Sequence, residues 1–436
     1  MNKMNIKILL KIYVFMILAL SCSDTNDDQI EPVVYSDSID FYDENNMSDD
    51  FVFVVENSST NSYLINKQGF KVWEWNFDTN SGNDLEILPN GDLVGIFKST
   101  DPFIDFGGWG GIVKILNKNN ATLWEYEFSD ENTISHHDVE MLPNGNILVM
   151  IWERIANEVA VGNGVDVQTD IFTEKIVEIN PSNNEIIWEW RSWDHIIQDK
   201  YESLPNYGNL NANPGKININ YTVDNPPGGN FFEGGDIMHA NGLDYDPIND
   251  IIFLSVNYFD EIWVIDHSTT IQESQSDTGG NYNKGGDLIY RFGNPNTYDS
   301  LGEKLFDKNH FPNLLEDGVE GEGNVLVYVN GNSSGQSIVY ELELPNQLNL
   351  NSNSNNEPTI RWSYTNDELF ATKLSGAVRL SNGNTLITES DYGLWEITPD
   401  GEIAWKYNKG EAANIWRAYH YSVNGQVSES LGLIQD

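Results

Sequence analysis

Short runs of alternating apolar and polar residues recur along the chain, and turns rich in asparagine and glycine join them in pairs. Residues 84–96 and 138–150 each contain an alternating run, a Pro-Asn-Gly turn and a second apolar run. Asn-Gly favours the tight turn of a β-hairpin, because both turn residues adopt positive φ angles. Residues 377–388 give a third copy, and residues 243–255 give a looser fourth. The pattern predicts a series of β-hairpins.

A second kind of hairpin alternates with the first and pairs an apolar strand with a strand rich in tryptophan or other aromatic residues. Its six copies lie at residues 63–75, 113–126, 176–190, 262–290, 338–362 and 394–405. Because two hairpins make one four-stranded blade, the count predicts an all-β fold, a six-bladed β-propeller. The missing inner hairpin would form where the chain ends meet, with Phe51–Val55 pairing near Ile415.

The first residues of the chain have the composition of an export signal. Three lysines precede an apolar run at residues 12–20, which is too short to remain as a membrane-spanning helix. The run ends at Ser21 and Cys22, and Cys22 is the only cysteine of the chain. The segment Leu18-Ala19-Leu20-Ser21-Cys22 resembles the lipobox of bacterial lipoproteins, which implies that the thiol is acylated. An ordinary secreted protein with an incidental thiol is the alternative.

These observations give a simple domain plan. We expect residues 1–21 to be a lipoprotein signal peptide, residues 22–50 a flexible acidic tether, and residues 51–436 the propeller. The protein would then be an exported lipoprotein, held by Cys22 at the outer membrane on its periplasmic or cell-surface face.

The charge of the chain narrows the choice of partners. The 436 residues carry a formal net charge of -44, so the protein would repel a nucleic-acid backbone, and we expect no nucleic-acid partner. The acidity indicates a surface adapted to solubility. With one cysteine, no disulfide can form within the chain.

Histidines stand at equivalent places in three neighbouring blades. His136 and His137 precede one predicted inner strand, His239 precedes the next, and His310 precedes the one after that. Inner strands of a propeller line its central channel, so these imidazoles should converge there. They could bind a transition metal, or supply a nucleophile and its electrostatic partners, and their spacing matches no common zinc motif.

Several longer segments around these histidines resemble bacterial aryl-sulfate sulfotransferases. The resemblance extends from about Tyr63 to Tyr421, and the family's six-bladed propeller agrees with the repeat count. The segments that carry it are residues 136–146, 236–247, 262–270, 278–280, 285–295 and 323–331.

The resemblance implies a reaction without cofactor or metal. A small phenolic sulfate ester would donate its sulfuryl group to a histidine, and a phenol would accept it. By position His310 matches the histidine that is transiently sulfated. His239 and one of His136 and His137 match the supporting catalytic histidines.

Two departures from the family pattern concern substrate binding. Studied members carry an arginine where this chain has Asn257, and they tend to have Gln-His-Asp where it has residues 309–311, Asn-His-Phe. The lost aspartate is a potential orienting partner of the imidazole. Because a sulfate ester is an anion, a cation is needed elsewhere. We name Arg154, Asn257, Arg417 and Asn241 as candidate substrate-binding residues.

Two other functions fit the same sequence. The chain could be a glycan-active propeller, similar to a polysaccharide lyase, that uses histidine, tyrosine and arginine on acidic sugars. It could also be a propeller that binds without catalysis. Its loop tryptophans Trp109, Trp152 and Trp193 would then stack on sugars or phenols, although packing between blades is the commoner fate of a tryptophan.

Overall fold

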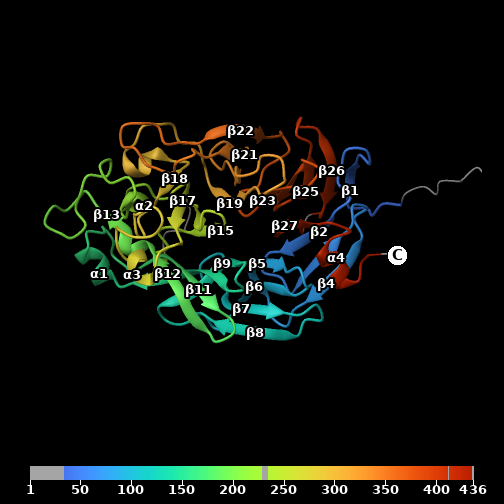
Figure 1. Ribbon diagram of the computed structural model, residues 1–436, viewed down its shortest axis with the longest axis horizontal. Helices are drawn as coiled ribbons and strands as arrows, with labels where there is room; N and C mark the ends of the chain where they lie inside the picture. Colours follow the sequence, from blue (N-terminus) through green and yellow to red (C-terminus); the bar gives the residue numbers. More distant parts are fainter. Residues whose placement is uncertain (1–33, 228–233, 411, 435–436) are drawn as a thin grey trace, which may run out of the picture. The chain divides into compact units, whose positions relative to one another are not determined.

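The computed structural model describes residues 34–227, 234–410 and 412–434. It divides into a unit of residues 1–34 and a second unit, Tyr35–Asp436. The predicted signal peptide and Cys22 lie outside the described residues, so the lipid anchor stays a prediction. The second unit is a six-bladed β-propeller, as the repeats predicted (Figure 1).

Each blade is an antiparallel sheet of four strands, numbered here from the channel outward. The first blade contains β27 (Ile415–Tyr421), β2 (Phe51–Glu56), β3 (Asn61–Ile65) and β4 (Lys71–Asn76). The second contains β5 (Ser81–Ile87), β6 (Leu93–Lys98), β7 (Gly111–Leu116) and β8 (Thr122–Glu127). The third contains β9 (Thr133–Met141), β10 (Ile147–Ile155), β11 (Ile171–Asn180) and β12 (Glu185–Arg191).

The second half of the ring continues the pattern. The fourth blade contains β15 (Ala240–Asp246), β16 (Ile251–Val256), β17 (Glu261–Asp266) and β18 (Tyr290–Phe292). The fifth contains β19 (Asn309–Leu314), β20 (Val325–Val329), β21 (Ile338–Glu343) and β22 (Thr359–Tyr364). The sixth contains β23 (Gly376–Arg379), β24 (Thr385–Glu389), β25 (Gly393–Ile397) and β26 (Ile403–Asn408).

The two ends of the propeller sequence close the ring within one blade. Strand β27 pairs antiparallel with β2, from Phe51 opposite Tyr421 to Glu56 opposite Ile415, and Figure 1 shows the two side by side. This is the pairing that the sequence predicted. Val52–Val55 are fully buried, so the joint is also part of the hydrophobic core.

The boundary of the tether was predicted wrongly. Residues 22–50 were expected to be flexible, but β1 (Ile39–Tyr42) pairs with β26 and adds a fifth strand to the sixth blade. Ser48 and Asp50 are also buried, and the Ser48 amide donates to Glu396. The strand has only four residues and lies within a segment rich in Asp, Asn and Ser, so it shows no recognisable alternation.

Short elements fill the long connections. They are α1 (Asn157–Gly162), α2 (Tyr221–Asp224), α3 (Ile271–Ser274), α4 (Gln426–Leu431), the 3₁₀ helices η1 (Ser192–His195) and η3 (Pro295–Tyr298), and the parallel pair β13 (Ile196–Ile197) and β14 (Ile217–Asn218). In the part of the chain that the structure describes, no helix combines the length and apolarity needed to cross a bilayer.

Tryptophans of the outer strands pack between blades. Trp75, Trp190 and Trp405 are fully buried although they lie on β4, β12 and β26, each of which is the fourth strand of its blade counted from the channel. Each side chain of this size buries about 150–250 Å², so these residues supply a large share of the contact between neighbouring sheets. The aromatic strands of the repeat therefore serve packing between blades.

Removing β27 should abolish the closed fold. We expect a chain that ends before Ile415 to aggregate, because β2 would become an exposed, apolar edge strand. A control chain that ends at Gly425 loses only α4 and the burial of Val427 and Leu431, so it should stay folded with a lower melting temperature. Gel filtration and thermal melts followed by circular dichroism measure both, and a monomeric, cooperatively melting chain without β27 would contradict the expectation.

Candidate active site

A cavity of about 330 Å³ opens where the inner strands begin, and we call it the histidine cavity. It brings together three of the predicted residues, His137, His239 and His310. They come from three consecutive blades, and the rings of His137 and His239 lie 4.9 Å apart between centroids. The lining also includes Asn83, Lys98, Asp105, Phe106, Trp109, Asn257, Tyr258, Lys308, Asn332, Lys373 and Leu374.

An irregularity in each inner strand accompanies its histidine. The pairing register shifts at residues 136–138, at Asn241 and at Phe311. His137, His239 and Phe311 have φ angles of 53°, 50° and 51°. A non-glycine residue in this left-handed region costs about 1–3 kcal/mol, and such bulges redirect side chains next to functional sites. Left-handed backbone therefore recurs next to the histidines of three blades.

His310 is held by two hydrogen bonds that define its tautomer. Its Nδ1 lies 2.6 Å from Oδ1 of Asn330, whose amide nitrogen donates to the carbonyl of Ala371 at 2.8 Å. The amide oxygen of Asn330 therefore faces the imidazole, and Nδ1 must carry the proton that it donates. The backbone N–H of Leu374 donates to Nε2 of His310 at 3.2 Å. Both contacts are consistent with one neutral tautomer, with the lone pair on Nε2.

Burial keeps His310 uncharged. Burial lowers the pKa of its imidazole to about 3, and the hydrogen bond to Asn330, which acts in the opposite direction, does not compensate. Asn330 thus takes over the orienting role that a carboxylate would fill, without adding a negative charge that would favour the imidazolium. The sequence contained this signal, because Asn330 lies in the segment 323–331 that carries the family resemblance.

His137 is oriented by His136 rather than by a carboxylate. The Nδ1 atoms of the two rings lie 2.9 Å apart, and Nε2 of His136 lies 3.0 Å from Oε2 of Glu174. His136 is fully buried and stacks on Trp152 at 3.9 Å, so it supports the cavity from behind. Burial lowers the pKa of both histidines well below the usual range, and the neighbouring His239 lowers both further.

A glycine permits the close approach of the His137 ring to the opposite wall. A Cβ atom on Gly108 would lie 2.1 Å from Nε2 of His137, and Gly108 has a φ of 92°. Any side chain at this position would therefore displace the imidazole.

His239 forms a carboxylate–histidine pair. Its Nδ1 lies 2.5 Å from Oδ2 of Asp236, and its ring stacks on Tyr258 at 4.8 Å between centroids. Oδ1 of Asp236 also accepts the backbone N–H of His239, so the pair is rigid. Since Asp236 accepts from Nδ1, the Nδ1–H tautomer is favoured here as in His310.

The two candidate asparagines hold the backbone next to His310. The side-chain amides of Asn241 and Asn257 donate to the carbonyl of Asn309 at 2.9 and 3.1 Å. Asn309 in turn donates to Ser255 and to the carbonyl of Glu261. Asn257 also lines the histidine cavity, whereas Asn241 is fully buried and is not among the lining residues.

The two candidate arginines lie elsewhere. Arg154 pairs with Asp170 through a 2.7 Å hydrogen bond, and it does not line the histidine cavity. Arg417 is buried and pairs with Asp138 at 2.8 Å and with Asp84 at 3.6 Å. Burial opposes its charge, but Asp138, Tyr419 and Asp84 together outweigh burial and raise the pKa of Arg417. It lines a second cavity, further along the inner strands.

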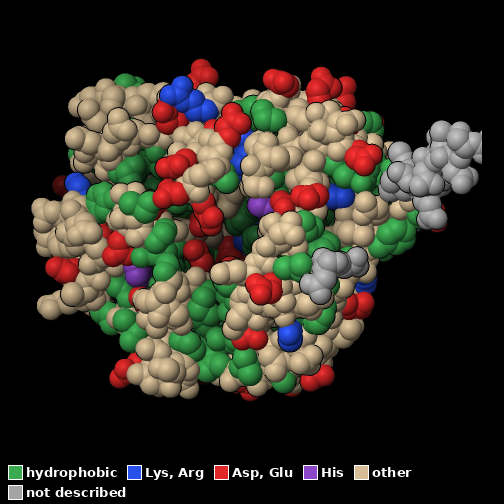
Figure 2. Space-filling model, turned by 45° about the vertical axis from the view of Figure 1, so that its right-hand side comes forward, with side chains coloured by type: hydrophobic (Ala, Val, Ile, Leu, Met, Phe, Trp, Pro, Cys, Tyr) green, Lys and Arg blue, Asp and Glu red, His purple; other side chains and the backbone are tan. Residues whose placement is uncertain are grey.

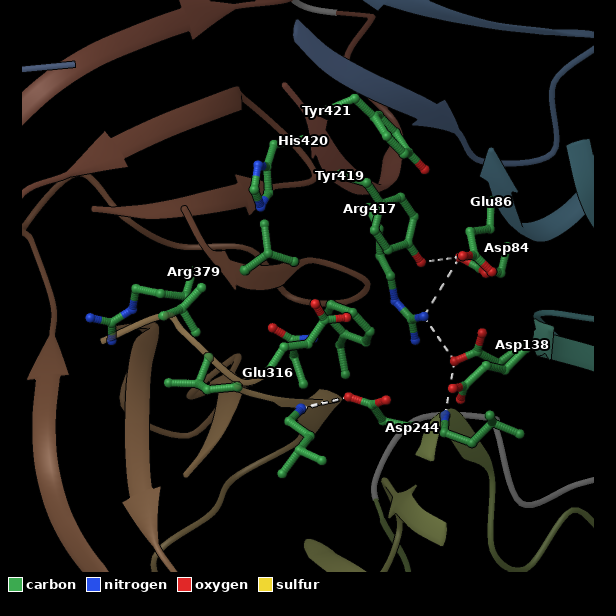
Figure 3. Close-up of a pocket in the computed structure, with 18 of the residues that line it drawn as sticks. Asp84, Glu86, Asp138, Asp244, Glu316, Arg379, Arg417, Tyr419, His420 and Tyr421 are labelled. Carbon is green, nitrogen blue, oxygen red and sulfur yellow. Dashed lines mark hydrogen bonds and ion pairs between the residues drawn. The ribbon is translucent and has the colours of Figure 1, made fainter. Parts of the chain in front are cut away.

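This second cavity of about 390 Å³ has the opposite charge, and we call it the acidic cavity. Figure 3 shows Arg417 between Asp84 and Asp138, with other carboxylates around it, and Figure 2 shows acidic side chains around a hollow in the propeller. Burial raises the pKa of Glu86 and of Asp244 to about 7. The acidic residues of its lining are Asp84, Glu86, Asp138, Glu140, Asp244 and Glu316.

The histidine cavity contains cations that the sequence analysis did not consider. In the part of the lining that the structure describes, Lys98, Lys308 and Lys373 stand against the single carboxylate of Asp105. Lys98 lies over the ring of Trp109 at 4.4 Å, and burial lowers its pKa. The family pattern pointed to an arginine as the cation, whereas Lys308 stands only two residues before His310. Among the described residues, no group of three His, Cys, Asp or Glu side chains is arranged to hold a metal ion.

A six-bladed propeller with three histidines in one axial cavity defines the class of site, and the comparisons with known proteins identify the family. The family model for arylsulfotransferases (ASST) matches residues 41–342, well over half of the chain. The chain therefore belongs to the arylsulfotransferase family. The match includes all four catalytic candidates and ends before Lys373 and Arg417.

Solved structures resemble this chain at low identity, and the comparison with curated protein sequences finds no match. The periplasmic gluconolactonase PpgL of Pseudomonas aeruginosa is 9% identical, with 86% of this chain and 99% of that chain covered and a TM-score of 0.41. BamB from Moraxella catarrhalis is 10% identical, with 88% and 81% covered and a TM-score of 0.33.

The hydrogen bond from His310 to Asn330 should be important for stability. Replacing Asn330 with leucine leaves a buried N–H of His310 without an acceptor, which should lower the free energy of unfolding by about 1–3 kcal/mol. Asn332→Leu is a matched control, because the amide of Asn332 bonds an exposed carbonyl, and we expect a change within about 0.5 kcal/mol. Urea denaturation measures both, and equal values for the two variants would refute the expectation.

The neutral His310 also predicts a pH dependence of stability. The folded protein leaves this ring unprotonated down to about pH 3, whereas the unfolded chain protonates it near pH 6.5. The unfolded state binds more protons in this window, so stability should fall as the pH drops from about 6.5 towards 3. His310→Gln should lose less stability between about pH 7 and pH 5 than the parent. Urea midpoints at both pH values test this, and an identical loss in parent and variant would contradict it.

Proposed function

We propose that this member of the arylsulfotransferase family moves a sulfuryl group from a phenolic sulfate ester to a phenol through a sulfo-histidine at His310. The observation that carries the proposal is the state of His310. It is neutral, its proton is fixed on Nδ1 by Asn330, and it shares a cavity with two further histidines and three lysines.

In the first half-reaction, the lone pair of His310 Nε2 attacks the sulfur atom of the ester. A nitrogen–sulfur bond forms while the ester oxygen–sulfur bond breaks, and the aryl oxygen leaves with the bonding electrons. The imidazole becomes positively charged, and its Nδ1–H continues to donate to Asn330, which supports the intermediate. Attack requires that Nε2 give up the 3.2 Å bond from Leu374, which frees that N–H for a sulfuryl oxygen.

In the second half-reaction, an acceptor phenol loses its proton and its oxygen attacks the same sulfur. The nitrogen–sulfur bond breaks, and its electrons return to His310 Nε2. His239, oriented by Asp236, and His137, oriented by His136, would act as bases that take the proton of the acceptor. That proton then passes to the phenolate released in the first half-reaction, so the proton balance closes without a cofactor.

The first experiment asks for transfer and for the intermediate. With 4-nitrophenyl sulfate, we expect continued release of nitrophenol over many turnovers only when a phenol acceptor is added, and His310→Asn should abolish it. Mass spectrometry of the enzyme after exposure to donor alone should show one added SO₃ on the peptide that contains His310.

His420→Asn is the matched control. His420 lines the acidic cavity and pairs with Asp50, so it shares the residue type but not the site, and its replacement should leave transfer intact. Full activity of His310→Asn would end the proposal. Absorbance from unsaturated sugars, formed from acidic polysaccharides without transfer, would favour the glycan-active alternative.

A further inference from the structure

The environment of Lys308 suggests how an acidic protein binds an anion beside its histidines. Lys308 lies two residues before His310 and lines the same cavity, and its side chain is 17% exposed. Its backbone has a φ of 63°, and its carbonyl accepts the backbone N–H of Asn330 at 2.8 Å. The segment that positions the imidazole and its partner therefore also fixes this lysine.

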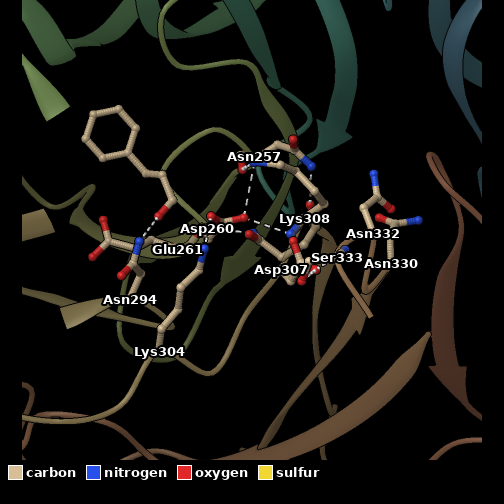
Figure 4. Close-up of polar contacts among 12 residues, drawn as sticks. Asn257, Asp260, Glu261, Asn294, Lys304, Asp307, Lys308, Asn330, Asn332 and Ser333 are labelled. Carbon is tan, nitrogen blue, oxygen red and sulfur yellow. Dashed lines mark hydrogen bonds and ion pairs between the residues drawn. The ribbon is translucent and has the colours of Figure 1, made fainter. Parts of the chain in front are cut away.

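Two lysines share one carboxylate at this place, as Figure 4 shows. Lys304 Nζ donates to Oδ2 of Asp260 at 2.6 Å. Oδ1 of Asp260 accepts the backbone N–H of Lys308 at 2.7 Å, and the ammonium of Lys308 lies 3.4 Å away from the same oxygen. One carboxylate cannot neutralise two ammonium groups, and its short ion pair is with Lys304. Within the described ranges of the chain, Lys308 pairs only with this shared carboxylate, so part of its positive charge is left uncompensated.

The other contacts of Lys308 are also long. Its Nζ lies 3.4 Å from the carbonyl of Asn257 and 5.7 Å from the centre of the Tyr258 ring. Both residues line the histidine cavity. An ammonium group has three donors, and these contacts leave its capacity for a strong, charge-assisted hydrogen bond unused.

We propose that Lys308 is the anion-binding residue of the histidine cavity and that it holds a sulfuryl oxygen of an aryl sulfate beside His310. The inference rests on the proposed function and names the group that recognises its substrate. Lys98 and Lys373, on other walls of the cavity, add to the attraction of the anion. Asp260 positions Lys308 through its backbone and does not consume its charge, because Lys304 meets that carboxylate.

The test measures binding without turnover. The probe is 4-nitrobenzenesulfonate, which carries the same anionic group on carbon and has no ester bond to break. We expect Lys308→Met to weaken its binding by about tenfold or more, since a charge-assisted hydrogen bond contributes about 1.5–3 kcal/mol. Lys308→Arg, which keeps the charge, should bind within about threefold of the parent. Isothermal titration calorimetry at low salt gives the affinities, and melting temperatures confirm that the variants fold.

Lys175→Met is the matched control, because it removes a lysine that pairs with Glu189 and lies outside the cavity lining. It should leave binding unchanged. Equal binding by Lys308→Met and the parent, or equal losses in Lys175→Met and Lys308→Met, would overturn the inference. Because no chemistry is needed, an inactive parent that binds through Lys308 would sink only the transfer reaction. An active parent indifferent to Lys308 would sink only the anion site.

Discussion

Hydrogen bonds between β2 and β27 join the two ends of the propeller sequence, and the axial channel exists only because this joint closes the ring. Closure places Arg417, on β27, opposite strands from distant parts of the sequence. There it donates to Asp138 on β9 and to the carbonyl of Asn241 on β15. Asp138 also accepts the backbone N–H of Leu243. One buried network thereby holds the inner strands of three blades together. The histidines lie near the N-terminal ends of the inner strands of their blades.

Burial then sets the chemistry of the cavity. Removing an imidazole from water disfavours its cation, and for His310 the charges of His239, Arg417 and Lys308 act in the same direction. His310 can therefore be a nucleophile at neutral pH without a base to deprotonate it. Its partner is the uncharged amide of Asn330, which orients the ring and adds no negative charge that would favour the imidazolium. The left-handed backbone at His137, His239 and Phe311 persists because the closed ring and the interblade bonds leave these residues little freedom.

The repeats predicted the blade number, the closure by Phe51–Val55, and the meeting of His137, His239 and His310, because all three follow from periodicity. Other features depend on side-chain direction, which periodicity does not give. Asp138 follows His137 directly, yet the two line different cavities.

Sequence periodicity also could not predict which cation lines the histidine cavity or where the tether ends. The sequence placed Arg417 on an inner strand, but it did not show that its carboxylate partners come from other blades. Lys308 was visible beside His310 and was overlooked because only arginines were considered. Strand β1 was missed because four residues are too few to show a period and they lie within a segment rich in Asp, Asn and Ser.

The two cavities differ in the charge of the side chains that line them. Lysines line one cavity and carboxylates gather in the other, so the charge of the lining changes along the inner strands. A field of this kind acts on a charged ligand before any contact forms, and it is strongest at low ionic strength. In the proposed reaction, the anionic ester would be drawn in past the lysines and repelled by the carboxylates. Substrate and released phenolate would then enter and leave on the same side of the propeller.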